Sequence, residues 1–143
     1  MCCKQKLNAL LLLTLTLGCW SCNKEDDTGP CDQRVQIDGQ RYENGSSDFF
    51  TIMEAGLEGE CLSISIVSAG CSGNDWSVAL IDSGREEAGD PPQRALRLLL
   101  ANPELCEAQV LRTYTFDMRS IQTSDELLLL LDGWEESIIN SKE

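Results

Sequence analysis

Four cysteines between residues 31 and 106 are the side chains whose chemistry is easiest to predict from the sequence. They are Cys31, Cys61, Cys71 and Cys106. Cysteines spaced by roughly two to four residues, often joined by histidines, are typical of zinc sites. None of the four has a cysteine neighbour at that spacing, and the chain contains no histidine. Two disulfides are therefore expected, and zinc is the disfavoured alternative.

A predicted strand limits how these cysteines can pair. Residues 62–68 alternate between apolar and polar side chains, and a strand of this length covers about 23 Å. A disulfide needs Cα atoms within about 7 Å, so Cys61 and Cys71, which flank the strand, should not bond to each other. We assume that the strands expected at 62–68, 76–82, 95–100 and 107–116 are successive antiparallel neighbours. This order brings Cys71 to Cys106 and leaves Cys31–Cys61 as the second pair.

Catalytic motifs are missing from the sequence. Without histidine there is no Ser-His-Asp triad, Cys-His pair or histidine metal site. There is also no G-x-S-x-G, glycine-rich phosphate loop or H-E-x-x-H motif. The residue types present would allow a catalytic pair of carboxylates like that of glycosidases. With 24 acidic residues in the chain, however, two carboxylates often lie close together by chance. We expect a protein that is not an enzyme.

Acidic loops offer the best candidate metal ligands. These are Asp75, Asp82, Glu86, Glu87 and Asp90. Carboxylate oxygens suit calcium, but the chain has no D-x-D-x-D-G loop, and Arg85 interrupts one cluster. Solvated polar loops are the favoured interpretation, so no cofactor is expected and calcium is a weak alternative.

Aromatic and arginine side chains are the remaining candidates for binding. Trp134 follows an Asp-Gly turn and could lie exposed at one end of the domain, where an indole can stack on a sugar. Packing in the core or at a sheet edge is the commoner role for such a residue, and it is the role expected for Trp76, Tyr42, Tyr114 and Phe49-Phe50. The arginines at 94, 97, 112 and 119 are expected to pair with acids, with an anion-binding face as the alternative.

Period-two patterns after Cys31 indicate the elements that must position these residues. Strands are expected at 35–42 with a hairpin turn at Asp38-Gly39, at 49–55, 62–68, 76–82 and 107–118, and in a hairpin at 127–139 with a turn at Asp132-Gly133. Residues 83–92 are expected to form a polar loop. Residues 93–105 fit either a helix starting at Asp90-Pro91 or a strand, and the strand is preferred.

About eight short strands in this length are typical of an all-β, antiparallel two-sheet sandwich. An immunoglobulin-like or similar topology is expected, although the Cys…Trp…Cys spacing of immunoglobulin domains is absent. A small closed barrel is the alternative.

The N-terminal segment predicts the compartment. Lys4 and Lys6 precede an apolar run at 7–17, which fits a signal peptide and is too short to span a bilayer. The small residues before Cys19 and Cys22 make this region similar to the lipobox of bacterial lipoproteins.

The sequence "CNKEDD", which begins at Cys22, resembles the acidic export signal of Bacteroidetes-type surface lipoproteins. This resemblance implies lipidation of Cys22, with Cys19 as the alternative site, and exposure on the outer membrane. A plain secretory signal is the competing interpretation. The expected domains are a signal peptide at 1–21, an acidic tether at 22–30 and a β-domain at 31–143.

The charge of the expected mature chain limits its partners. Residues 22–143 carry nine basic and 24 acidic side chains, a net charge of −15. Such a surface is unsuited to nucleic acid or to polybasic binding of anionic lipid, so membrane attachment is expected through the acyl chains alone.

We expect a non-catalytic binding or accessory module for a glycan or protein. The alternative is a structural or assembly subunit of the cell envelope. A third option is a small enzyme, or a protease inhibitor using a loop such as 83–92.

Overall fold

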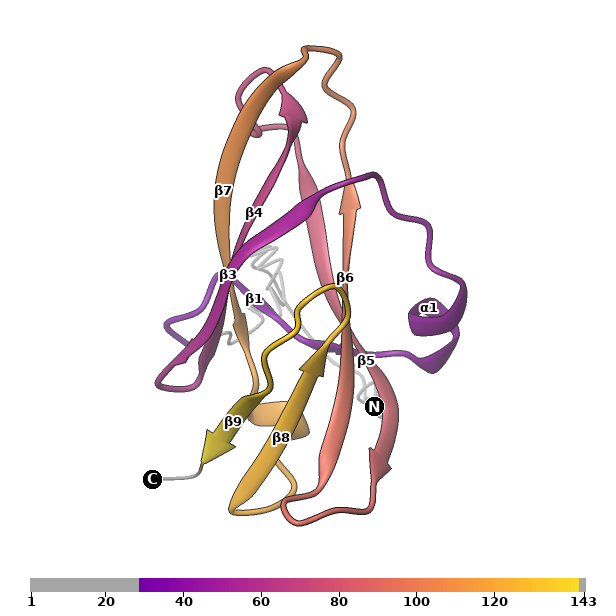
Figure 1. Ribbon diagram of the computed structural model, residues 1–143, viewed down its shortest axis with the longest axis vertical. Helices are drawn as coiled ribbons and strands as arrows, with labels where there is room; N and C mark the ends of the chain where they lie inside the picture. Colours follow the sequence, from indigo (N-terminus) through magenta and orange to yellow (C-terminus); the bar gives the residue numbers. More distant parts are fainter. Residues whose placement is uncertain (1–28, 142–143) are drawn as a thin grey trace, which may run out of the picture.

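The computed structural model describes residues 29–141, which form two β-sheets packed face to face (Figure 1). In chain order the elements are β1 (Gln33–Arg34), β2 (Gln36–Ile37), α1 (Gly39–Asn44), β3 (Thr51–Glu58), β4 (Cys61–Gly70), β5 (Ser77–Glu87), β6 (Gln93–Ala101), β7 (Ala108–Asp117), the 3-10 helix η1 (Arg119–Ile121), β8 (Glu126–Leu131) and β9 (Ile138–Ser141). Cys19 and Cys22, the predicted signal peptide and most of the predicted tether lie outside the described residues. Among the described residues, no helix has the length and apolarity needed to cross a bilayer.

The predicted two-sheet sandwich is confirmed. One sheet has four strands in the order β1-β7-β4-β3, and the other has five in the order β2-β5-β6-β8-β9. The segment that fitted either a helix or a strand contains β6, so the strand preference was right. The expected polar loop at 83–92 is shorter than predicted, because β5 continues to Glu87.

Alternating side chains build the core between the sheets. In β4, Leu62, Ile64 and Ile66 are fully buried, whereas Ser63 and Ser65 lie on the other face of the strand. Fully burying each such aliphatic side chain stabilises the fold by about 1.5–3 kcal/mol. The period-two pattern therefore determines which face of the strand packs inward.

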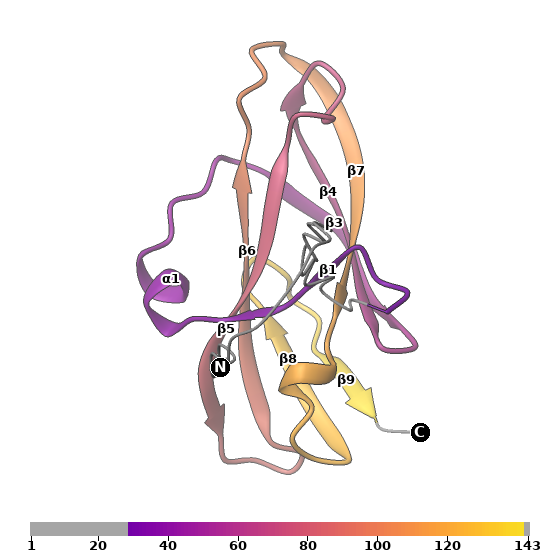
Figure 2. The same ribbon diagram turned by 180° about the vertical axis from the view of Figure 1, so that it is seen from behind.

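One extended segment joins both sheets along one side of the sandwich (Figure 2). Its first part, β1, pairs in parallel with β7, and its second part, β2, pairs in parallel with β5. Val35 lies between these two parts, is buried, and donates its backbone N–H to the carbonyl of Asp117 at 3.2 Å. A third parallel pairing joins β6 to β8. The sandwich is thus mainly antiparallel with three parallel contacts.

The hairpin predicted at Asp38-Gly39 is wrong. Asp38 is the N-cap of α1, and its carboxylate accepts the backbone N–H of Arg41 at 3.0 Å. Asp-Gly favours a hairpin turn when apolar and polar residues alternate on both sides of it. The residues that directly follow Gly39 are polar and show no such alternation. Asp38 therefore caps a helix instead. The second Asp-Gly pair does turn the β8–β9 hairpin, where Gly133 has a φ of 82°.

A buried ion pair connects β5 and β6. Arg94 donates from Nε and Nη2 to the two carboxylate oxygens of Asp82, at 2.9 and 2.7 Å. The Asp82 side chain is fully buried, and a third hydrogen bond comes from the backbone N–H of Gly84 at 2.7 Å. The expected pairing of arginines with acids across strands is confirmed here. Removing one partner would leave the other charge buried without compensation.

We expect Arg94→Met to lower the free energy of unfolding by about 3–5 kcal/mol, because it strands the Asp82 carboxylate in the interior. Arg85→Met is the matched control, since the Arg85–Glu43 pair is exposed and should be worth less than about 1 kcal/mol. Urea unfolding with both disulfides intact measures the two changes. Equal unfolding midpoints for the two variants would contradict the role given to the buried pair.

Candidate functional site

The two disulfides lie at opposite ends of β4. Cys31 is bonded to Cys61 at its start, and Cys71 is bonded to Cys106 just beyond its end. Ten strand residues separate these ends by about 33 Å. Both pairs agree with the expected connectivity, but the strand order assumed for it is wrong, because β4 and β5 belong to different sheets. The pairing holds because β7 is the true antiparallel neighbour of β4 and begins directly after Cys106.

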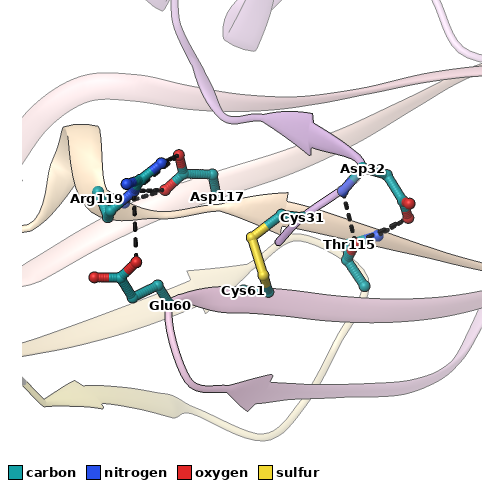
Figure 3. Close-up of a disulfide and its surroundings, with 7 residues drawn as sticks. All are labelled: Cys31, Asp32, Glu60, Cys61, Thr115, Asp117 and Arg119. Atoms are coloured by element: carbon teal, nitrogen blue, oxygen red, sulfur yellow. Dashed lines mark hydrogen bonds and ion pairs between the residues drawn. A yellow bond between two sulfur atoms is a disulfide. The ribbon is translucent and has the colours of Figure 1, made fainter. Parts of the chain in front are cut away.

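The end near Cys31 holds the point where the N-terminal segment enters the domain (Figure 3). Asp32 donates its backbone N–H to Thr115 Oγ1 at 2.9 Å and accepts the Thr115 N–H at 3.0 Å. The Cys31–Cys61 disulfide beside this contact is buried. We call this the proximal end, because the predicted tether joins the domain here.

A cluster of charged side chains around Arg119 completes the proximal end. Arg119 Nη2 lies 2.7 Å from an oxygen of buried Asp117, and Arg119 Nε lies 3.6 Å from Glu60 (Figure 3). Hydrogen bonds from Arg119 hold the pKa of Asp117 below its ordinary value, although burial raises it. A hollow of about 500 Å³ adjoins this cluster. Its charged lining residues, Arg119 and Glu60, are already engaged in these ion pairs, so the hollow is a weak candidate for a charged ligand.

The opposite end, which we call the distal tip, consists of residues 71–75 and 102–107. At its centre, the Glu104 carboxylate accepts backbone N–H groups of Cys71, Ser72 and Gly73 at 2.6, 3.1 and 2.9 Å. Gly73 has a φ of 71°, which helps consecutive N–H groups to converge on one oxygen. Partial desolvation raises the pKa of Glu104, but the hydrogen bonds from Gly73, Ser72 and Cys71 outweigh it and lower the pKa to about 2. The carboxylate therefore serves as a permanently charged clasp between the two loops at neutral pH.

Asn102 ties a third segment to the distal tip. Its side-chain amide donates to the carbonyl of Ala69 at 2.7 Å and accepts the N–H of Glu104 at 3.0 Å. Its own backbone N–H donates to Asp48 at 2.7 Å. The loop that precedes β3 is thus fixed to the β6–β7 loop.

Two large apolar side chains are exposed on these fixed loops. Leu105, between Glu104 and Cys106, is 96% exposed, and Phe49, beside Asp48, is 84% exposed. The expectation that Phe49 packs in the core is wrong. Its neighbour Phe50 does pack against the core. Neighbouring residues in extended chain point to opposite sides, so only one of the two can face inward.

Trp134, considered as a possible platform for a sugar, takes the packing role that was the favoured expectation. Trp134 is only partly exposed and packs against the core, and its Nε1 is enclosed without a hydrogen-bond partner among the described residues. Trp76 is 7% exposed and belongs to the core, as expected. Trp134 therefore lies where packing rather than sugar stacking is its evident role.

The candidate calcium ligands are dispersed. Asp82 is committed to Arg94, and Glu86 accepts a hydrogen bond from Thr123. Across residues 29–141, no three acidic or cysteine side chains converge as a metal site would require.

The arrangement of the distal tip was missed by sequence reasoning. The pattern "GCSGND" at 70–75 is rich in glycine and small polar residues, which permits an N–H cradle. Nothing in the sequence assigns Glu104 to it, because Glu104 and Gly73 are 31 residues apart. Leu105 is the last residue of the segment 93–105, and no feature of the sequence marks it as exposed.

Comparisons with known proteins identify a likeness of fold and no family. No protein-family model and no curated protein matches the chain. A solved structure described as a protein of unknown function, DUF1344, from Bacteroides vulgatus ATCC 8482 is similar, with a TM-score of 0.52 and 13% identity. The match covers 78% of this chain and 56% of that one, so it spans little more than half of the neighbour's length.

The clasp at the distal tip should be sensitive to acid. The pKa of Glu104 falls from 4.5 to about 2 on folding, so its stabilising effect is complete above pH 4.5 and is lost as the pH drops through 2. We expect Glu104→Gln to lower the urea midpoint at neutral pH and to approach the parent protein near pH 2. Glu107→Gln, two residues beyond Leu105, is the control and should behave as the parent throughout. A pH-independent deficit for Glu104→Gln would contradict the charged clasp.

The two disulfides should differ in their rates of reduction. Cys71 and Cys106 are exposed, whereas Cys31 and Cys61 are 5% and 6% exposed. A thiolate must reach a sulfur atom to exchange with it, so limited dithiothreitol should open Cys71–Cys106 first. Alkylation followed by peptide mass spectrometry measures which cysteines become free. Simultaneous labelling of all four would show that reduction requires global unfolding.

Proposed function

We propose that this protein is a lipid-anchored component of the outer cell surface whose β-sandwich is a non-catalytic binding module. The observation that carries the binding role is Leu105, which is almost fully exposed on a loop held by a disulfide and by the Glu104 clasp. A single exposed leucine is ordinary on a protein surface, but here both neighbours are fixed, so little entropy is lost when a partner covers it.

The proposed anchor is Cys22, with Cys19 as the alternative. Two disulfides support an oxidising compartment outside the cytoplasm. The proximal end receives the tether, so the distal tip would point away from the membrane. The exposed side chain of Leu105 at that end would then be the part of the molecule that meets a partner.

A second candidate is a structural or assembly role in the envelope. The strand β3 ends its sheet and pairs with β4 alone among the described strands of that sheet. Met53 on β3 is 56% exposed. An open edge of this kind can accept a strand from another subunit, although the irregularity between Ile52 and Glu54 interrupts its regular spacing.

Metabolic labelling with an alkyne fatty acid tests the anchor. We expect Cys22→Ser to abolish incorporation and to release the protein from the outer membrane, whereas Cys19→Ser keeps both. Antibody binding to intact cells should detect the parent protein. If Cys22→Ser is still labelled and Cys19→Ser is not, the lipidated residue is Cys19. If the parent protein takes up no label, the proposed lipid anchor is wrong.

Crosslinking of the same cells separates the two proposed roles. An assembly subunit would be recovered in one stoichiometric complex that survives Leu105→Ser. A binding module would lose its crosslinked partner in that variant.

A further inference from the structure

Both sides of Leu105 are fastened to the same loop. On the N-terminal side, Glu104 is held by the N–H groups of Cys71, Ser72 and Gly73. On the C-terminal side, Cys106 is bonded to Cys71 itself. The peptide bond between Leu105 and Cys106 is thus spanned by two independent attachments to residues 71–73.

From this arrangement we infer that residues 102–107 form a substrate-like inhibitory loop for a serine peptidase with an apolar specificity pocket, which Leu105 would enter. This assignment rests on the proposed binding role of the distal tip and names the class of partner. The loop differs from residues 83–92, the segment for which the sequence alone suggested an inhibitory role.

The shape of the loop suits an enzyme cleft. Residues 102–107 have no helical or strand structure, and they form the apex of the molecule in both views (Figures 1 and 2). Leu105 is 96% exposed, so its whole side chain is available to a pocket. Burying a leucine in an apolar pocket is favourable, and the fixed neighbours reduce the cost of ordering the loop.

The two attachments determine the outcome when a peptidase attacks the loop. The peptidase serine Oγ adds to the carbonyl carbon of Leu105, and the bond to the Cys106 nitrogen breaks as that nitrogen takes the proton held by the peptidase histidine. The new amine of Cys106 remains tied through its disulfide, and the acyl group remains tied through Glu104. Because neither product leaves, the amine can attack the ester, restore the peptide bond and return the proton to the serine. The complex persists instead of turning over.

The disulfide favours a serine nucleophile over a cysteine one. Both Cys71 and Cys106 are exposed, and Cys106 directly follows the attacked carbonyl. A catalytic thiolate could exchange with this disulfide and release the C-terminal attachment. A serine hydroxyl has no such reaction, so the loop stays closed during the encounter.

Exchanging Leu105 for a basic residue provides the test. We expect the full-length, disulfide-bonded protein to inhibit chymotrypsin and subtilisin, which accept apolar side chains, and to leave trypsin active. Leu105→Lys should raise the inhibition constant for chymotrypsin by at least about 100-fold, because a charge would enter an apolar pocket, and should create inhibition of trypsin. Leu111→Lys is the matched control, since Leu111 is 60% exposed on β7 and lies outside the loop, and it should behave as the parent.

Full activity of chymotrypsin and subtilisin with about 10 μM of the protein would overturn the assignment. Cleavage between Leu105 and Cys106 at the rate of an ordinary substrate would do the same, as would a Leu105→Lys variant that leaves trypsin uninhibited. Because Leu105 is exposed, the substitution should leave the fold intact, and an unchanged circular dichroism spectrum verifies this. Lipid labelling and surface detection are independent of these assays, so a negative result would remove the peptidase as partner without removing the anchored binding module.

Discussion

The antiparallel pairing of β4 with β7 is the constraint on which the rest of the molecule depends. It runs without interruption from Cys61 opposite Asp117 to Gly70 opposite Ala108. Each end of the ladder is closed by a disulfide, one to the entering chain at Cys31 and one across the distal tip. Two long strands held at both ends place the tether contact and the exposed loops about 33 Å apart. The separation of the proximal end from the distal tip is a direct result of this geometry.

Ion pairs join strands to each other and to the loops beside them. Arg94 and Arg119 are engaged by acids, and Arg97 lies 3.7 Å from Asp132, so three of the four arginines considered for an anion-binding face are paired with carboxylates. The chain carries many more acids than bases, and its surface stays negatively charged. The fourth arginine, Arg112, donates to the side chain of Asn74 at the distal tip, and Leu105 is the large apolar side chain exposed there.

The alternation of apolar and polar residues predicted strands correctly where that alternation alone determines the structure. The alternation in residues 62–68 predicted β4, because side chains of a strand point to opposite faces whatever the partner strand is. The prediction failed at Asp38-Gly39, where the same dipeptide can cap a helix or turn a hairpin. The neighbour order of the strands was also wrong, since pairing between distant segments leaves little trace in either segment.

By itself the sequence determined a β-rich domain, its inward-facing aliphatic residues and the exclusion of a Cys61–Cys71 bond, since each depends on residue type, period or strand length. The final disulfide pairing depended on which strands are neighbours, because β7 and not β5 lies beside β4. Only the tertiary structure decided that Trp134 packs against the core while Leu105 is exposed, and that Glu104 binds the N–H groups of a loop about 30 residues away. These outcomes depend on which loops meet at the end of the sandwich. That meeting is set by long-range strand pairing, which no short stretch of sequence encodes.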